Sequence, residues 1–307
     1  MIMKIGCLHP YVVNKGRFHI DSFGKIISDE LKLPCGKCEH CLQRRQRDWS
    51  LRLNIEYEYS FNSVFLTLTY NNENLPKHKG IPTLCYTDVQ LFVKRLREFF
   101  SRKYPTSAPI RFYLCGEYGP RTLRPHYHIL FFNIPDLRHF TERVRRLWKK
   151  GFIEWKKPAR DHFNYLTTYI NYNDSRLLSL INSKRIQPPF RRMSLRKAIG
   201  YQYLERINRI TWHRNTLTTY IQLHGFKYAM PRYYYDRIFD CEETRLELRR
   251  RSEAYFAEQS EEYFELYGHD DSLRIAAGQP TNFEEAVQSF LYNYYRKLNR
   301  QKYHRKL

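Results

Sequence analysis

The sequence predicts an α+β fold built on one antiparallel sheet. Strand-like segments rich in β-branched and aromatic residues lie at 64–70, 111–115 and 126–132, and a short fourth one lies at 152–155. Two segments with apolar residues at helical spacing separate the first strand from the second and the third from the fourth. The order strand, helix, strand, strand, helix, strand is the split βαβ, or ferredoxin-like (βαββαβ), arrangement, with both helices on one face. We expect the other face to be open to a ligand.

Each helix has its own start and stop signals. The first begins at a capping box, with Thr87 as N-cap and Gln90 three positions later, and it ends before Pro105. The second begins at Asp136, and Gly151 is its expected C-terminal cap. The apolar stripe of the first helix is the clearest amphipathic pattern in the chain. Its members are Val89, Phe92, Val93, Leu96, Phe99 and Phe100.

The flanking segments suggest four regions. Residues 1–60 form a Cys-rich element followed by a helix over 43–59, residues 61–175 form the core, residues 176–240 form a basic and aromatic region, and residues 241–307 form a helical extension. The helix over 43–59 has an apolar side and a predicted basic outer face, made of Arg44, Arg45, Arg47 and Arg52. Within the third region, residues 184–197 hold six basic residues and no acid, which predicts a mobile basic loop or a solvated linker. Acidic residues from 242 to 268 and apolar spacing over 283–298 predict two helices in the extension.

Composition points to a polyanionic partner. The 307 residues carry a net charge of +22, and 16% of them are aromatic, which offers ring faces for unpaired bases. No apolar run of ~18 residues and no signal peptide is present, so we expect no membrane association. Seven Cys without an export signal indicate reduced thiols or metal ligands in a cytoplasm.

Two candidate metal sites stand out. His126 and His128 share one face of their strand because side chains alternate, and Glu117 lies close enough in sequence to add an oxygen ligand. A bare His-x-His is also compatible with two ordinary strand residues. The second candidate is a four-thiolate zinc site, with His40 as an alternative ligand. Its members are Cys7, Cys35, Cys38 and Cys41. Free thiols at the start of a helix are the competing interpretation.

The string Gly116-Glu117-Tyr118-Gly119, followed by Arg124-Pro125-His126-Tyr127-His128, resembles the metal-binding motif of the HUH endonucleases. It most closely resembles the replication initiators of microviruses and their gokushovirus relatives, phages with small single-stranded DNA genomes. The resemblance extends in pieces from Cys7 to about Phe239 and includes the Cys element and the strand at 64–70. It implies a ferredoxin-like HUH core and Mg or Mn as the catalytic metal.

Tyr165 and Tyr169 are four residues apart and share a helix face. Aromatic residues at this spacing are usually core residues. The resemblance instead implies that both tyrosines are nucleophiles, since the phage initiators carry Tyr-x-x-x-Tyr on the helix after the fourth strand. The chain departs from that pattern where lysines are common, because it has Thr168 and Tyr172 at those places.

These features together predict a rolling-circle replication initiator that nicks and rejoins single-stranded DNA at a phage origin through a 5′-phosphotyrosine link. No helicase motif is present, so a host helicase must unwind the DNA and a host polymerase must extend it, in the bacterial cytoplasm. Two alternatives remain at this stage. One is a DNA- or RNA-binding protein without enzymatic activity, such as a repressor or packaging factor. The other is a metal-dependent nuclease that uses water.

Overall fold

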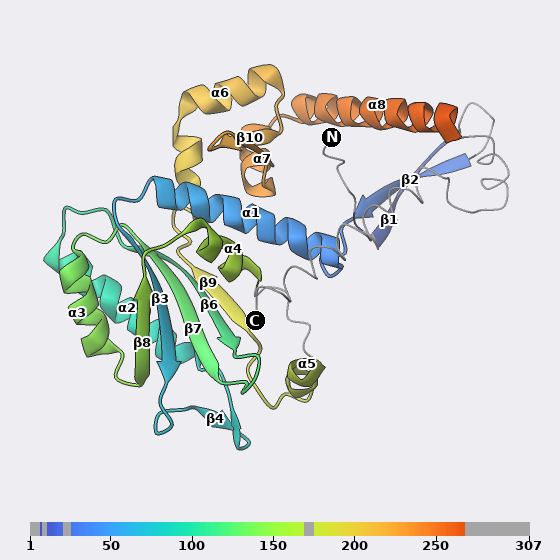
Figure 1. Cartoon of the computed structure of the whole chain (residues 1–307). Coiled ribbons are helices and arrows are strands. Elements are labelled where there is room, and N and C mark those ends of the chain that lie inside the picture. Colours follow the sequence, from blue (N-terminus) through green and yellow to red (C-terminus); the bar gives the residue numbers. More distant parts are fainter. Residues whose placement is uncertain (1–6, 8–10, 21–25, 169–174, 268–307) are drawn as a thin grey trace. The chain divides into compact units, whose positions relative to one another are not determined.

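The structure, a computed structural model, describes residues 7, 11–20, 26–168 and 175–267. The chain divides into two compact units. One comprises residues 1–41, 213–218 and 235–307, and the other comprises residues 42–212 and 219–234. The second unit contains the main sheet and the helices that cover it (Figure 1).

Five strands form the main sheet of the second unit, and every neighbouring pair is antiparallel. Along the sheet they run β8 (Gly151–Lys156), β3 (Ser63–Tyr70), β7 (Pro125–Phe132), β6 (Arg111–Tyr118) and β9 (Phe190–Met193). Helix α2 (Tyr86–Lys103) connects β3 to β6, and α3 (Leu137–Leu147) connects β7 to β8. The α+β class and the four predicted strands with their two intervening helices are therefore confirmed.

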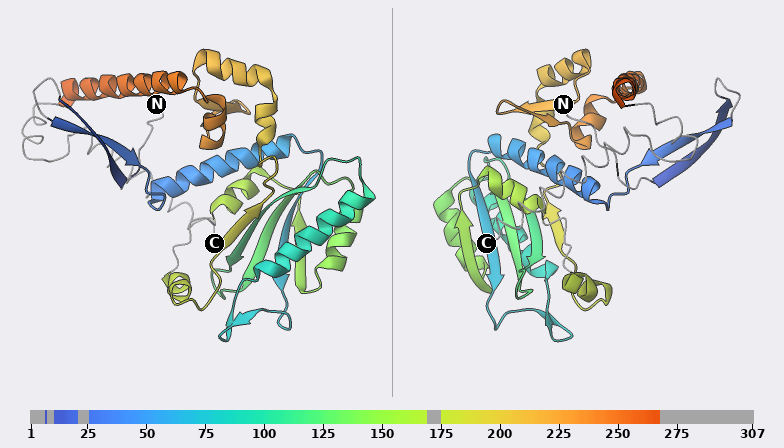
Figure 2. Two further views of the ribbon diagram at one scale, coloured as in Figure 1. Left: turned by 180° about the vertical axis from the view of Figure 1, so that it is seen from behind. Right: turned by 45° about the vertical axis from the view of Figure 1, so that its right-hand side comes forward.

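Helices α2 and α3 pack on one face of the sheet (Figure 2). Their apolar stripes meet buried side chains from alternate positions of β3, β6 and β7. Phe92, Leu96 and Phe140 are almost fully buried there, next to Leu66 and Tyr127 of the sheet. The helical spacing of the apolar residues thus predicted correctly which side of each helix enters the core.

The opposite face is not open along its whole length, contrary to the expectation from the strand and helix order. Helices α1 (Glu39–Glu58) and α4 (Arg160–Thr168) cover part of it, with Leu53, Phe163 and Leu166 in a second buried cluster. The strands reach this cluster with Phe65 and Phe132, because β3 and β7 carry apolar residues on both faces. A strand that is apolar on both faces needs cover on both.

Two predicted helix ends are wrong. Helix α2 begins at Tyr86, with Cys85 at the N-cap position and no capping side chain, so Thr87 lies inside the first turn. Gly151 does not cap α3 but opens β8, where a Cβ atom would lie 2.2 Å from the carbonyl oxygen of Thr69. Only a glycine lets the two backbones approach this closely. The predicted start of α3 is confirmed, since the Asp136 side chain accepts a hydrogen bond from the His139 amide.

Tertiary contacts overturn two further expectations. Arg52 was placed on the outer basic face of α1, yet it is buried, with its guanidinium stacked between the rings of Trp49 and Tyr233. The segment predicted as a basic loop contains β9, which pairs with β6. The ring of Phe190 lies against Gly116 there, and a Cβ on Gly116 would be only 3.0 Å from it.

Shorter elements complete the described chain. They are β1 (Tyr11–Ile20), β2 (Ile26–Leu33), β4 (Lys77–His78), β5 (Ile81–Pro82), α5 (Ser175–Asn182), the 3₁₀ helix η1 (Tyr201–Glu205), α6 (Ile207–Thr216), β10 (Tyr220–Leu223), β11 (Phe226–Ala229), α7 (Arg232–Ile238) and α8 (Glu242–Tyr267). The hairpin of β1 and β2 was not predicted, whereas α8 matches the predicted acidic helix. The helix predicted over 283–298 lies outside the described residues. Among the helices that the structure describes, none is both long and apolar enough to cross a bilayer.

Candidate metal centre and catalytic face

Strand pairing brings the three predicted metal ligands together. Glu117 of β6 lies directly opposite His126 of β7, and His128 lies two positions further on the same face. The Glu117 Oε1 atom is 2.5 Å from His126 Nε2 and 2.7 Å from His128 Nε2. One carboxylate oxygen therefore meets both imidazoles at the nitrogen that each has available for a metal. Glu117 belongs to the strand itself, so no swing of the turn is needed.

The second nitrogen of each imidazole is held by a neighbour. His126 Nδ1 lies 3.1 Å from the carbonyl oxygen of Arg124, and His128 Nδ1 lies 3.0 Å from the Thr67 hydroxyl on β3. An Nδ1–H that donates to such a partner orients the ring and directs Nε2 to the metal side. The sequence placed Thr67 in a strand but gave it no role. Only the pairing of Thr67 with His128 reveals it, and pairing register is not visible in a single strand.

The carboxylate at the centre is buried and incompletely satisfied. Glu117 is 4% exposed, and its Oε2 atom has no hydrogen-bond partner in the described part of the chain. Burial lowers the pKa of His126, but the hydrogen bond and negative charge of Glu117 outweigh it, so the pKa of His126 is raised above its usual value. A buried anion with one unsatisfied oxygen, next to two oriented imidazoles, fits a divalent cation. Carboxylate and imidazole together suit Mn, and carboxylate suits Mg.

Helix α4 lies on the same face of the sheet as these ligands. The ring of Phe65 stacks on His128 on one side and on His162 of α4 on the other, with centroid distances of 5.5 and 4.7 Å. The Ser50 hydroxyl of α1 donates to the Asn164 side chain over 2.6 Å, which fixes α4 against α1. The aromatic stack thus connects the ligand cluster to the helix that carries the first candidate tyrosine.

The two candidate tyrosines differ in what the structure describes. Tyr165 belongs to α4, three positions after His162, and residues at this spacing lie on the same side of a helix. Tyr169 lies outside the described residues, as does Tyr172. Asp161 was expected to cap this helix, but α4 starts at Arg160 instead. The amide of Ala159 donates to His162 Nδ1 over 2.8 Å, so His162 serves the helix start as well as the stack.

The four cysteines predicted as zinc ligands also come together, around the start of α1. The sulfur atoms of Cys7, Cys35, Cys38 and Cys41 all lie within 4.8 Å of one another. The sulfurs of Cys7 and Cys38 are 3.7 Å apart, close to the ~3.8 Å edge of a tetrahedron with ~2.3 Å zinc–sulfur bonds. His40, the alternative ligand, is not a member of this group of described residues.

Backbone amides prepare this cluster for negative sulfur. The amides of Cys38 and Lys37 both donate to Cys35 Sγ, over 3.2 and 3.4 Å. These two hydrogen bonds are the main reason why the pKa of Cys35 falls to about 6. The Cys35 amide donates in turn to Cys7 Sγ over 3.2 Å. Four converging sulfurs with amide donors form a donor set that fits zinc and leaves no ligand position for a substrate.

Comparison with known proteins connects the sheet and its ligands to DNA replication. The family model for replication-associated protein ORF2 matches residues 63–174, from the start of β3 to just beyond α4. Replication-associated protein VP4 of Bdellovibrio phage phiMH2K is 32% identical over 231 residues, which cover 69% of this chain and 70% of that protein. No solved structure matches the chain.

Two further relatives have the same printed role. Replication-associated protein ORF4 of Chlamydia phage 1 is 27% identical over 237 residues, or 71% of this chain and 56% of that protein. Replication-associated protein ORF2 of Spiroplasma virus 4 is 30% identical over 193 residues, or 58% of each chain. The chain therefore belongs to the family of phage replication-associated proteins.

Proposed function

We propose that this protein is a site-specific single-stranded DNA endonuclease and strand transferase that initiates rolling-circle replication of a phage genome. The observation that carries the proposal is the convergence of Glu117, His126 and His128 on one face of the sheet. The core at 61–175 would be a ferredoxin-like HUH domain. The strand order β8-β3-β7-β6 supports this, because it places the two strands of the split βαβ unit, β3 and β6, on either side of β7.

The three ligands would hold Mg or Mn, of which the donor set favours neither outright. A divalent cation bound there would polarise the scissile phosphate and offset the charge that develops on it. Thr67 and the Arg124 carbonyl hold the imidazoles in the orientation that this requires. Glu117 contributes the negative charge, and its buried Oε2 atom has capacity for a further partner.

Tyr165 and Tyr169 would be the nucleophiles. A phenolic oxygen attacks phosphorus, the bond from phosphorus to the 3′ oxygen breaks, and the phenolic proton ends on that 3′ oxygen. The products are a 5′-phosphotyrosine link and a free 3′-OH. One phosphoester replaces another, so the reverse reaction can rejoin the strand. Because a free tyrosine has a pKa of ~10, a basic group must assist its deprotonation. The lysines common in the resembling initiators are absent here, so this chain must use a different group.

Partners follow from the same proposal. The substrate is single-stranded DNA at a phage origin, and the net charge of +22 suits its phosphates. The released 3′-OH would prime a host polymerase, with a host helicase opening the duplex, in the cytoplasm of the bacterium. The printed names of the three relatives support a role in phage replication.

The covalent intermediate tests the proposal directly. Full-length protein is incubated with circular single-stranded phage DNA and Mn or Mg, and the products are resolved on a denaturing gel. We expect a protein–DNA adduct that requires the metal and disappears when EDTA is added first. Binding without cleavage would instead indicate a repressor or packaging factor. Cleavage without an adduct would indicate a nuclease that uses water.

The Cys cluster is proposed to hold a structural zinc ion. Elemental analysis of purified protein should find about one zinc per chain, as expected for one four-thiolate site. Cys38→Ser should lose that zinc and lower the melting temperature, since metal binding at such a site contributes to folding. Cys241→Ser is the matched control, because this exposed cysteine lies outside the cluster. Fully folded, active protein without zinc would refute the assignment.

A further inference from the structure

The hairpin of β10 and β11 is exposed in a way that folding alone does not explain. It is a two-stranded sheet in which Leu223 pairs with Phe226 across a turn at His224 and Gly225. Both turn residues have positive φ, 51° and 81°, as a tight hairpin turn requires. All four residues of β11 are exposed, whereas Ile221 of β10 is fully buried and anchors the hairpin.

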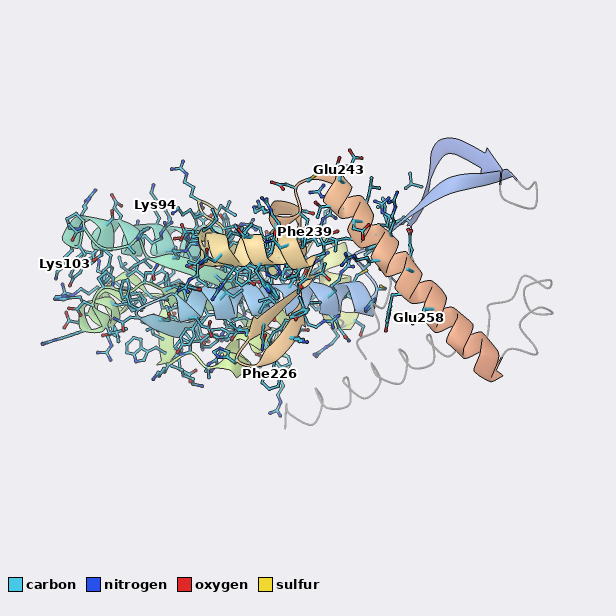
Figure 3. The ribbon with its side chains drawn as sticks, turned by 90° about the horizontal axis from the view of Figure 1, so that it is seen from above. Lys94, Lys103, Phe226, Phe239, Glu243 and Glu258 are labelled. Atoms are coloured by element: carbon cyan, nitrogen blue, oxygen red, sulfur yellow. The ribbon has the colours of Figure 1, made fainter. Side chains whose placement is uncertain are left out.

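Large rings occupy this exposed surface. Phe226, beside the turn, is 63% exposed (Figure 3), and Tyr228 on the same strand is 39% exposed. Trp212 is 45% exposed and makes an edge contact with Tyr220, with centroids 6.3 Å apart. Exposed aromatic residues gathered on one element indicate a binding surface more often than isolated ones do.

The surrounding charge selects the kind of partner. From 206 to 235 the chain has five Lys or Arg residues and no Asp or Glu. The ammonium of Lys227 lies 4.7 Å from the centre of the Tyr220 ring, and the carboxylate of Glu58, which reaches the turn from α1, is paired with His224. Flat apolar rings on a basic segment complement a partner with exposed ring faces and negative charge. Unpaired nucleotides have both properties, whereas the bases of a duplex are stacked inside it.

We infer that this hairpin is a stacking platform for unpaired bases of single-stranded DNA, with Phe226 and Tyr228 as the stacking rings and Lys227 at a phosphate. This inference rests on the proposed function only for the identity of the DNA. The surface uses none of the metal ligands, so it would hold the strand whether or not cleavage occurs. Its recognition would be tolerant of sequence, because every base offers a ring face.

The test measures binding in the absence of metal. Full-length protein is titrated into a fluorescent oligothymidylate in EDTA, so no cleavage can interfere. The double variant Phe226→Ala, Tyr228→Ala should bind about 5 to 150-fold more weakly for each stacked base lost, with an unchanged salt dependence. Lys227→Gln should instead reduce the slope of log affinity against log salt by about 0.7. Phe152→Ala is the matched control, because Phe152 on β8 is 70% exposed and outside the hairpin.

A second pair of variants separates stacking from apolar contact. Phe226→Leu with Tyr228→Leu keeps apolar side chains but removes the flat rings, and it should weaken binding as much as the Ala pair does. Recovery of affinity with Leu would overturn the inference in favour of an apolar contact, such as one with a protein. Unchanged affinity of a folded Ala double variant would overturn it too, as would an equal loss of duplex binding. Failure of the wild type to form a covalent adduct would count against the proposed function alone.

Discussion

Replacing either His126 or His128 with Ala is expected to lower adduct formation by more than about a hundredfold while single-stranded DNA binding in EDTA changes little. Loss of a residue that only orients a metal ligand already costs about 10 to 100-fold, so loss of a ligand should cost more. Both imidazoles approach one oxygen of Glu117, and the remaining ligands cannot make up for the missing one. Binding depends mainly on dispersed Lys and Arg residues, such as Lys94 and Lys103 on the exposed side of α2 (Figure 3).

The measurement is a metal titration of the adduct yield, with melting curves to show that each variant is folded. His139→Ala is the matched control, since His139 lies on α3, which packs on the opposite face of the sheet. Glu117→Ala should raise the metal concentration needed more than it lowers the maximal rate, because two of three ligands remain. Full activity of a His126 or His128 variant in excess metal would show that the metal centre is elsewhere.

The double variant Tyr165→Phe, Tyr169→Phe is expected to form no adduct, whereas each single variant still forms some. Four residues, about one helical turn or ~5.4 Å of rise, separate the two positions, so both can serve one phosphate after a small shift of the DNA. Two nucleophiles allow a second cut at the regenerated origin while the first tyrosine remains linked to the old 5′ end. The released 3′-OH can then attack the first link and close a circle.

Loss of the hydroxyl alone leaves packing nearly intact, so inactivity of these variants could not be attributed to a cavity. Tyr57→Phe is the matched control, because the ring of Tyr57 packs on Phe163 of α4, 5.3 Å between centroids. Adduct formation by the double variant would move the nucleophile elsewhere, with Tyr172 as the next candidate. Complete loss in one single variant would indicate a one-tyrosine enzyme and rule out the alternating scheme.

Local periodicity was sufficient for much of the architecture. The apolar stripe of α2 and the alternation along β3 and β7 predicted these elements and their buried sides, because side-chain direction repeats with the backbone period. The same alternation predicted that His126 and His128 face the same way. Helix ends were less predictable, since Thr87 has the composition of a cap but Cys85 has the position.

Long-range contacts escaped this kind of reasoning. Arg52 has the sequence signature of a solvent-facing helix residue, yet Trp49 and the distant Tyr233 sandwich it. Phe190 lies in a segment with a loop-like charge pattern, yet it packs over Gly116 as part of a fifth strand. In both cases a partner is distant in the sequence, and no local pattern identifies it.

The sequence by itself determined the order of the core elements and which residue types carry metal-binding chemistry, because both depend on composition and short-range spacing. Only the tertiary structure decided that Glu117 lies opposite His126 and that Thr67 orients His128, since strand register depends on which surfaces are buried together. It also decided that α1 and α4 share the face of the sheet that carries these ligands. Apolar residues on both faces of β3 and β7 require cover on both sides, and the chain supplies it from segments far apart in the sequence.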